Sequence, residues 1–343
     1  MSQLLDSLAL PYAIAAALAA LVILVLAANT AVRKMVGLAE YLHLSATFMG
    51  MTVLSLATSI PEITAHLTAS AGILRGTLDF KVGSSIVLGA NIGSDVVQQT
   101  LVMGLVVLVA GSLYFRRYFL IKSMLPMIGT TLMCLILGFD GIYSRLDGAI
   151  LVGSFVAYTW YLYKDERRFF GTGDSRPSEP EAVSEIQTNR QAWLALGVAI
   201  LAMVATVLAA QAVLSVTERV VLVTGVGGSL LGVATLGLAS ALPELTTALA
   251  GARNKAHGIS MGTLVGSNIT NPLVAIGLGA LVSRYYVPKP LVWWDLPWET
   301  LTGAALLGWL LWRKGRIARA GAYVFVGMYV VYIFCRAFLF TAD

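Results

Sequence analysis

The chain has 343 residues, of which 58% are hydrophobic and only 12% are charged, and its net charge is +5. Because a soluble domain carries about 25% charged residues, this composition excludes a soluble globular protein. The basic residues lie in loops between apolar runs, which argues against nucleic-acid binding. The two cysteines, Cys134 and Cys335, lie far apart in apolar segments and indicate neither a disulfide framework nor a thiolate metal site.

Apolar runs of about 20 residues, long enough to cross a bilayer, recur along the whole chain. We therefore expect an all-α polytopic membrane protein with ten transmembrane helices. The first span lacks the basic start and cleavage site of a signal peptide, so we expect it to be retained. The expected spans are Tyr12–Ala31, Leu42–Ile73, Val82–Ala110, Ile121–Gly138, Leu146–Tyr163, Ala192–Val216, Val220–Ala250, Gly258–Leu281, Leu291–Trp312 and Ala320–Phe340.

A polar stretch containing glycine, proline and mixed charges separates the fifth span from the sixth. Its composition cannot bury a core, so we expect residues 164–190 to form a flexible cytoplasmic loop. This loop divides the chain into a first five-helix repeat, residues 1–163, and a second five-helix repeat, residues 191–343.

Basic residues are concentrated in alternate loops, which together hold 16 of the 23 lysines and arginines. By the positive-inside rule these loops face the cytoplasm, and both termini are then extracytoplasmic. Because each half has an odd number of spans, the second half crosses the membrane in the opposite direction. The sequence therefore predicts an inverted-topology repeat.

Two short strings nearly repeat each other in the middle of the second and seventh spans. They read Ala-Thr-Ser-Ile-Pro-Glu at residues 57–62 and Ala-Ser-Ala-Leu-Pro-Glu at residues 239–244. A carboxylate at the centre of a span costs about 2.5–3.5 kcal/mol. A proline there also frees backbone carbonyls that lipid cannot satisfy. Because a mid-span glutamate and a mid-span proline occur together in both strings, we expect two broken helices that form a cation site around Glu62 and Glu244.

A second pair of matched strings follows in the third and eighth spans. They share the skeleton Gly-x-x-x-Gly-Ser-Asp/Asn at residues 89–95 and 262–268. Small residues let helices approach closely, and an amide lies on the same helical face four residues beyond each serine. Together with the carboxylates, these side chains predict an all-oxygen cage for a hard cation such as Ca²⁺ or Na⁺, or for protons. The oxygen donors are Thr58, Glu62, Ser94, Gln98, Ser240, Glu244, Ser267 and Asn271.

These strings resemble the alpha-repeats of the cation/calcium exchanger superfamily, and especially those of compact prokaryotic sodium/calcium exchangers with ten spans. The likeness is strongest over residues 50–109 and 231–281, which correspond to alpha-repeats 1 and 2. It implies that Glu62 and Glu244 bind Ca²⁺ together with Thr58 and Ser240. It also implies that neighbouring hydroxyls and amides complete the Na⁺ positions, namely Ser59, Ser94, Gln98, Ser267 and Asn271.

The chain departs from the family pattern at several places. Ala241 stands where serine is common, Gln98 replaces asparagine, and Asn271 stands where some members carry aspartate. Asp95 is a third intramembrane acid, either a hydrogen-bonded structural group or a further cation ligand. His66 lies one turn beyond the first repeat glutamate. It is either buried between helices or a pH sensor coupled to that glutamate.

We expect a secondary active antiporter, not an enzyme, that exchanges Ca²⁺ for Na⁺ by alternating access at a mid-membrane site. An exchanger of the same fold that couples H⁺ to Ca²⁺ or another divalent cation is the alternative. A ten-span metabolite or drug exporter is more remote. The expected partners are the transported ions and the lipid of the cell (inner) membrane, with no cofactor, nucleic acid or obligatory protein partner.

Overall fold

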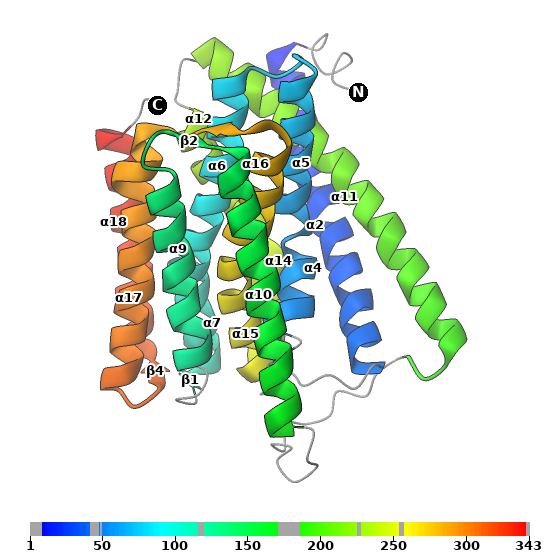
Figure 1. Cartoon of the computed structure of the whole chain (residues 1–343), viewed down its shortest axis with the longest axis vertical. Coiled ribbons are helices and arrows are strands. Elements are labelled where there is room, and N and C mark those ends of the chain that lie inside the picture. Colours follow the sequence, from blue (N-terminus) through cyan, green and yellow to red (C-terminus); the bar gives the residue numbers. More distant parts are fainter. Residues whose placement is uncertain are drawn as a thin grey trace.

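The computed structural model describes residues 9–41, 48, 50–115, 120–170, 186–224, 228–253 and 257–340. Helices form nearly all of it and stand side by side in an upright bundle (Figure 1). The protein is an all-α polytopic membrane protein, as the sequence predicts. Five helical stretches are long and apolar enough to cross a membrane, namely Phe80–Ala110, Leu120–Leu137, Gly228–Leu249, Ser260–Ser283 and Arg319–Leu339.

The described residues of the ten predicted spans are nearly all helical, although residues 42–47, 49 and 225–227 lie outside the described part. The boundary predicted between the sixth and seventh spans at residues 216–220 is wrong, because the helix of the sixth span continues to Thr224. Several segments contain a π-helical stretch, labelled η. The first half contains α2 (Leu10–Tyr41), η1 (Gly50–Leu54), α4 (Ser55–Thr58), α5 (Ile60–Leu74), α6 (Phe80–Val97), η2 (Gln98–Val102), α7 (Met103–Ala110), η3 (Leu120–Met124), α9 (Leu125–Leu137) and α10 (Arg145–Phe170).

The second half repeats this order. It contains α11 (Asn189–Thr224), α12 (Gly228–Leu231), η4 (Gly232–Gly237), α13 (Leu238–Ser240), α14 (Leu242–Arg253), α15 (His257–Thr270), η5 (Asn271–Ile276), α16 (Gly277–Ser283), η6 (Leu291–Asp295), α17 (Leu296–Trp312) and α18 (Arg319–Leu339). The π-helical stretches therefore fall in corresponding spans of the two halves, the second to fourth and the seventh to ninth. Such stretches are frequent at functional sites.

The polar loop predicted at residues 164–190 is shorter than expected. Helix α10 continues to Phe170 and α11 begins at Asn189, while residues 171–185 lie outside the described part. The polar end of α10 stays helical because it has partners. Asp165 forms an ion pair with Lys122 at 3.6 Å, and Lys164 lies over the ring of Trp160.

Two pairs of short strands close opposite ends of the bundle (Figure 1). Strand β1 (Ser112–Tyr114) pairs with β4 (Arg316–Ala318), and β2 (Ile142–Tyr143) pairs with β3 (Tyr285–Tyr286), both antiparallel. Strand β1 follows the third span and β3 the eighth, whereas β2 follows the fourth and β4 the ninth. Exchanging the two halves therefore turns one pair into the other, as an inverted repeat requires.

Ion pairs also join the start of one span to the end of the next in both halves. Asp295 accepts from Arg336 at 3.0 Å and from the Tyr332 hydroxyl at 2.7 Å, and both charged side chains are fully buried. Arg336 also donates to Ser229 at the start of α12. The pair between Lys122 and Asp165 is its counterpart in the first half, with the charges exchanged and with more exposure.

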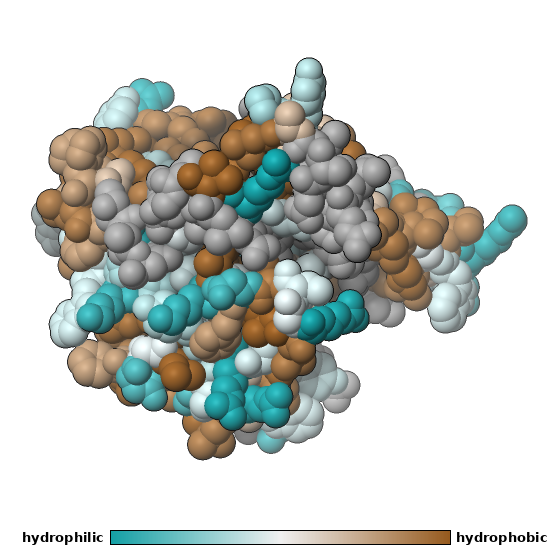
Figure 2. All heavy atoms as spheres, turned by 90° about the horizontal axis from the view of Figure 1, so that it is seen from above, coloured by the Kyte–Doolittle hydropathy of each residue, from teal (hydrophilic) through white to brown (hydrophobic). Residues whose placement is uncertain are grey.

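Apolar side chains cover much of the outside of the bundle. On α2 and α11, Tyr12 and Trp193 are 70% and 73% exposed. Figure 2 shows the end of the molecule from above, with hydrophilic residues on the end face and apolar residues around much of its edge. Apolar surface of this extent is suited to contact with lipid and not with water.

Candidate ion-binding site

The second span is broken next to the first proline-glutamate string. Helix α4 ends at Thr58, Ser59 turns, and α5 begins at Ile60 with Pro61 in its first turn. Proline fits there because it has no N–H to offer and its φ is already helical. The break places Glu62 in the first turn of α5, where the positive end of the helix dipole favours a negative charge.

The seventh span is broken in the same way. Helix α13 ends at Ser240, a single residue, Ala241, separates it from α14, and Pro243 lies in the first turn of α14. Glu244 therefore occupies a second helix start inside the bundle, and it is 0% exposed. The two broken helices thus present two carboxyl groups in equivalent positions.

Glycines let each broken helix cross the other half at close range. A Cβ on Gly89 of α6 would lie 2.3 Å from the backbone oxygen of Ser229, so α6 crosses the broken seventh span. In the corresponding contact, a Cβ on Gly262 of α15 would lie 3.0 Å from the Cα of Gly50. Larger side chains would push these helices apart, which is the role the small-residue spacing predicts.

These crossings bring the serines of the second pair of strings to the carboxyl groups. Ser94 Oγ donates to Glu62 Oε1 at 3.2 Å, and Gln98 Nε2 donates to Ser94 Oγ at 3.1 Å. Thr58 Oγ1 and Ser267 Oγ are 3.1 Å apart, and both hydroxyls interact with the Glu244 carboxyl. Each carboxyl group therefore has hydroxyl groups beside it.

An amide network ties this centre together across the two halves. Asn268 Nδ2 donates to Gln98 Oε1 at 3.1 Å, and Gln99 Nε2 donates to Asn268 Oδ1 at 2.8 Å. Asn271 Nδ2 donates to Asp95 Oδ1 at 2.8 Å. Two of these three links, Asn268 to Gln98 and Asn271 to Asp95, join corresponding positions of the repeats, and they contain one acid and three amides.

Several buried oxygens at this centre have no hydrogen-bond donor in the described part of the chain. They are Ser59 Oγ, Glu62 Oε2, Asn91 Oδ1, Asp95 Oδ2, Asn271 Oδ1 and both carboxyl oxygens of Glu244. Nor does Glu62 or Glu244 form an ion pair with any described lysine or arginine. Buried acceptors without partners are costly, and two facing carboxylates repel each other. A bound cation removes both penalties.

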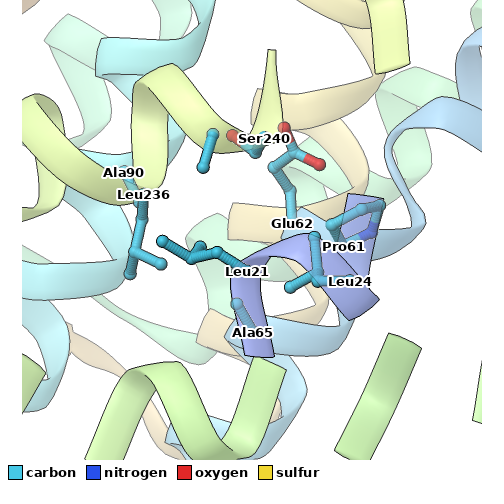
Figure 3. Close-up of a pocket in the computed structure, with 9 residues that line it drawn as sticks. Leu21, Leu24, Pro61, Glu62, Ala65, Ala90, Leu236 and Ser240 are labelled. Carbon is cyan, nitrogen blue, oxygen red and sulfur yellow. The ribbon is translucent and has the colours of Figure 1, made fainter. Parts of the chain in front are cut away.

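A cavity of about 30 Å³ reaches Glu62 from the side of α2 (Figure 3). The Glu62 carboxyl and Ser240 are its polar groups, and the rest of its wall is apolar. Among the described residues, no three acidic, histidine or cysteine side chains are placed to hold one metal ion together. A cation here therefore relies on two carboxyl groups and on neutral oxygens. The lining residues are Leu21, Leu24, Pro61, Glu62, Ala65, Ala90, Leu236, Ala239 and Ser240.

A family comparison identifies the kind of protein that carries this site. The model of the family described as sodium/calcium exchanger protein matches residues 12–164 and 194–338. The chain belongs to the sodium/calcium exchanger family. Membership makes it a multi-pass transporter of a cation antiporter family and not a member of a family of catalytic enzymes.

Curated relatives and solved structures agree with this family. The chain is 25% identical over 279 residues to the putative antiporter CaxA of Alkalimonas amylolytica, covering 78% of this chain and 79% of the relative. It is 27% identical to the inner membrane protein YrbG of Escherichia coli (strain K12), covering 83% and 84%. The sodium-calcium exchanger NCX_Mj, soaked with 2.5 mM Na⁺ and 0.1 mM Ca²⁺, shares the fold with a TM-score of 0.65 at 21% identity, covering 96% and 98%.

Within this exchanger fold, all nine predicted ligands are buried, and most of them meet at the two carboxyl groups. Ser59 lies in the first break, where its hydroxyl has no partner among the described residues, and Asn271 donates a hydrogen bond to Asp95. The predicted ligands, all buried, are Thr58, Ser59, Glu62, Ser94, Gln98, Ser240, Glu244, Ser267 and Asn271.

The two ambiguous residues occupy different surroundings. Asp95 is 0% exposed, and one of its carboxyl oxygens has no donor in the described part of the chain, so its placement fits a ligand as well as a structural acid. The His66 Nδ1 atom lies 3.1 Å from the Tyr285 hydroxyl, which also contacts Ser70 at 2.7 Å. The hydrogen bonds of His66 therefore join α5 to the strand β3.

The exchanger contains a further buried acid that sequence reasoning missed. Glu299 of α17 is 1% exposed, accepts from Thr131 at 2.6 Å and interacts electrostatically with Asp95. A third repeated string could have revealed it. Residues 125–131 and 296–302 both begin with Leu-Pro and end with threonine. Glu299 lies inside the second of these two strings.

Proposed function

We propose that this protein exchanges Ca²⁺ for Na⁺ across the membrane at the site formed by Glu62 and Glu244. The observation that carries the proposal is the pair of buried carboxyl groups with three unpartnered oxygens and no ion pair among the described residues. Two carboxylates balance one Ca²⁺, or more than one Na⁺ when neutral oxygens assist. A site that takes either set of ions but not both produces antiport.

In this proposal the Ca²⁺ ligands are the two glutamates with Thr58 and Ser240. The Na⁺ positions use the surrounding neutral oxygens, contributed by Ser59, Ser94, Gln98, Ser267 and Asn271. Hard cations prefer such oxygen ligands, and Ca²⁺ accepts the irregular geometry that side chains from four helices provide. The naming of one relative as a putative antiporter, and of the structural relative as a sodium-calcium exchanger, supports this choice of ions.

The proposed mechanism is alternating access. Helices α2 and α11 pack against each other and stand at a slant to the rest of the bundle (Figure 1). The cavity at Glu62 lies against α2, so movement of this pair changes the access to the site. We place the protein in the cell (inner) membrane with both termini extracytoplasmic, and the transported ions and lipid are its only proposed partners.

The test is uptake of ⁴⁵Ca²⁺ into proteoliposomes loaded with Na⁺. Uptake should require the outward Na⁺ gradient and should be lost in the Glu62→Gln and Glu244→Gln variants. A substitution distant from the site, Gly153→Ala, is the matched control, because a Cβ there meets no atom within 4 Å. Uptake that proceeds equally without Na⁺ would contradict the proposal.

Asp95 favours a second candidate, an exchanger that couples Ca²⁺ or another divalent cation to H⁺. This acid adds a third buried carboxyl group beside the centre and keeps one oxygen without a donor. The same vesicles distinguish the two candidates when they are prepared without Na⁺ and given a pH jump. Uptake driven by the pH jump alone supports H⁺ coupling, and its absence together with Na⁺-driven uptake supports Na⁺ coupling.

A further inference from the structure

A second cavity, of about 400 Å³, lies beside the β1–β4 end of the bundle, away from the ion site. We propose that this cavity, the Trp–Arg pocket, binds the phosphate headgroup of an anionic phospholipid. Volumes of this order are typical of ligand sites. The pocket is lined by Trp309, Trp312, Arg313, Lys314, Arg316, Ala318, Ala320 and Gly321.

The walls of the Trp–Arg pocket combine flat apolar surface with positive charge. The rings of Trp309 and Trp312 meet edge to face with their centres 5.7 Å apart. The Arg313 guanidinium lies 5.1 Å from the centre of the Trp312 ring. A lipid headgroup matches this surface, because it offers phosphate oxygens to the donors and a glycerol region to the rings.

The backbone that presents these charges is held in place. Lys314 and Gly315 both have positive φ angles, 52° and 85°, in a tight turn after α17. Gly315 N donates to Leu310 O at 2.6 Å, and Phe115 N donates to Gly315 O at 2.7 Å. The pairing of β4 with β1 fixes the residues that follow. The three cations therefore project from a fixed turn, and little ordering is needed when a headgroup binds.

The opposite end of the molecule shows that the fold does not require these residues. The corresponding turn after α9 ends at Gly141, whose φ of 87° matches that of Gly315, and it leads into β2. Its side chains are those of Phe139, Asp140 and Ile142, with neither tryptophan nor a basic residue. A turn that ends on a glycine of positive φ is thus built at that end without cations, so such a turn does not by itself require the basic residues of the Trp–Arg pocket.

The charges of the Trp–Arg pocket are not neutralised within the described part of the chain. Arg313, Lys314 and Arg316 are exposed and form no ion pair there. By the positive-inside rule this end faces the cytoplasm, where anionic lipids attract juxtamembrane basic groups. Tryptophan beside them is typical of the headgroup level. Free phosphate lacks an apolar part for the two rings, which favours a lipid as the occupant.

The first experiment is native mass spectrometry of the full chain in detergent with equal amounts of phosphatidylglycerol and phosphatidylcholine. We expect the protein to retain one phosphatidylglycerol molecule in preference to phosphatidylcholine. The variant Arg313→Gln/Lys314→Gln/Arg316→Gln should reduce that preference by roughly 100-fold, since each cation near an anionic headgroup contributes about fivefold. The matched control removes three cations elsewhere at the same end, Arg33→Gln/Lys34→Gln/Arg190→Gln, and should keep the preference.

Two results of this experiment would overturn the proposal. One is an equal preference in the Trp–Arg variant and in the control variant. The other is complete displacement of phosphatidylglycerol by millimolar inorganic phosphate, because the pocket would then be a site for free anions. Neither result depends on ion transport, so a failure here leaves the proposed exchange function untouched.

A second measurement uses the unmodified protein and does not depend on whether a variant folds. Nanodiscs of phosphatidylglycerol and of phosphatidylcholine are treated with an amine-acetylating reagent, and labelling is quantified at each lysine. Acetylation of Lys314 should be about fivefold lower in phosphatidylglycerol than in phosphatidylcholine, in line with the contribution of one cation to the binding of an anionic headgroup. Lys289, which is exposed at the other end, should be labelled equally in both lipids. Equal labelling of Lys314 in both lipids contradicts the proposal.

Discussion

At the scale of single residues, the two repeat glutamates are not equivalent. Glu62 accepts a hydrogen bond from Ser94, whereas neither carboxyl oxygen of Glu244 accepts one of good geometry from the described residues. The hydroxyls of Thr58 and Ser267 interact with Glu244 but also contact each other. If the proposed site is correct, we therefore expect Glu244 to depend more on a bound cation than Glu62 does, and Glu244 provides the clearer test of the site.

The first prediction concerns Glu244→Gln. The substitution keeps the shape of the side chain and removes one of two site charges, so Ca²⁺ binding should weaken by at least 100-fold. This follows because loss of one partner from a buried charge pair costs about 3 kcal/mol or more. Equilibrium binding of ⁴⁵Ca²⁺ in Na⁺-free detergent measures the effect. Binding within a few-fold of the wild type would remove Glu244 from the ligand set.

The second prediction concerns the acid outside the predicted ligand set. In Glu299→Gln the side-chain amide oxygen can still accept the hydrogen bond from Thr131. The other carboxyl oxygen, which has no donor among the described residues, is replaced by an uncharged amide nitrogen. We expect a higher temperature of unfolding and Ca²⁺ uptake within about twofold of wild type, because burying a charge is costly. A thermal melt and the vesicle assay check both. Abolished uptake in a well-folded variant would make Glu299 part of the ion site.

The sequence predicted the residues that lie at the centre better than it predicted their supports. The candidate ligands could be predicted because carboxylates and prolines are unexpected inside apolar spans and because the strings repeat. Gln99, Asn268 and Glu299 were not found, because their roles depend on which span lies opposite. That pairing is set by three-dimensional contacts such as those of Gly89 with Ser229, which spacing along the chain does not specify.

At the scale of elements, the crossing of α6 with the broken seventh span is the tightest contact at the site. The third prediction is that Gly89→Ala destabilises the protein and lowers Ca²⁺ uptake at least tenfold. A Cβ there would lie 2.3 Å from a backbone oxygen, so the helices have to separate. Gly153→Ala in α10 is the control and should be neutral or stabilising by up to about 1 kcal/mol, the helix preference of alanine over glycine.

The ion pairs that join consecutive spans give the fourth prediction. Arg336→Gln should lower the free energy of unfolding by about 3–5 kcal/mol, because the buried carboxylate of Asp295 then loses the cation that pairs with it. Asp165→Asn at the counterpart pair should cost less than about 1 kcal/mol, because that pair is partly exposed. Denaturation of the two variants in the same detergent compares them. Equal losses would mean that burial does not distinguish the two pairs.

At the scale of the whole molecule, the strand pairs mark two ends that face opposite sides of the membrane. The fifth prediction is that a membrane-impermeant maleimide labels Asp140→Cys from outside intact cells, whereas Arg319→Cys is labelled only after the membrane is opened. Both positions are exposed, and Cys134 and Cys335 are replaced by serine in the background. The reverse labelling pattern would invert the topology that the basic loops predict.

The small cavity beside Glu62 also bears on which ions can be carried. Its volume of about 30 Å³ has room for about two water molecules, since one water needs roughly 10–15 Å³ of such space. In this conformation an ion that approaches the carboxyl group from the α2 side has to leave most of its hydration shell behind. Mg²⁺ gives up water reluctantly, whereas Ca²⁺ accepts protein oxygens in flexible arrangements. We therefore expect the narrow approach to discriminate against Mg²⁺ through the cost of dehydration, before any ligand geometry is tested.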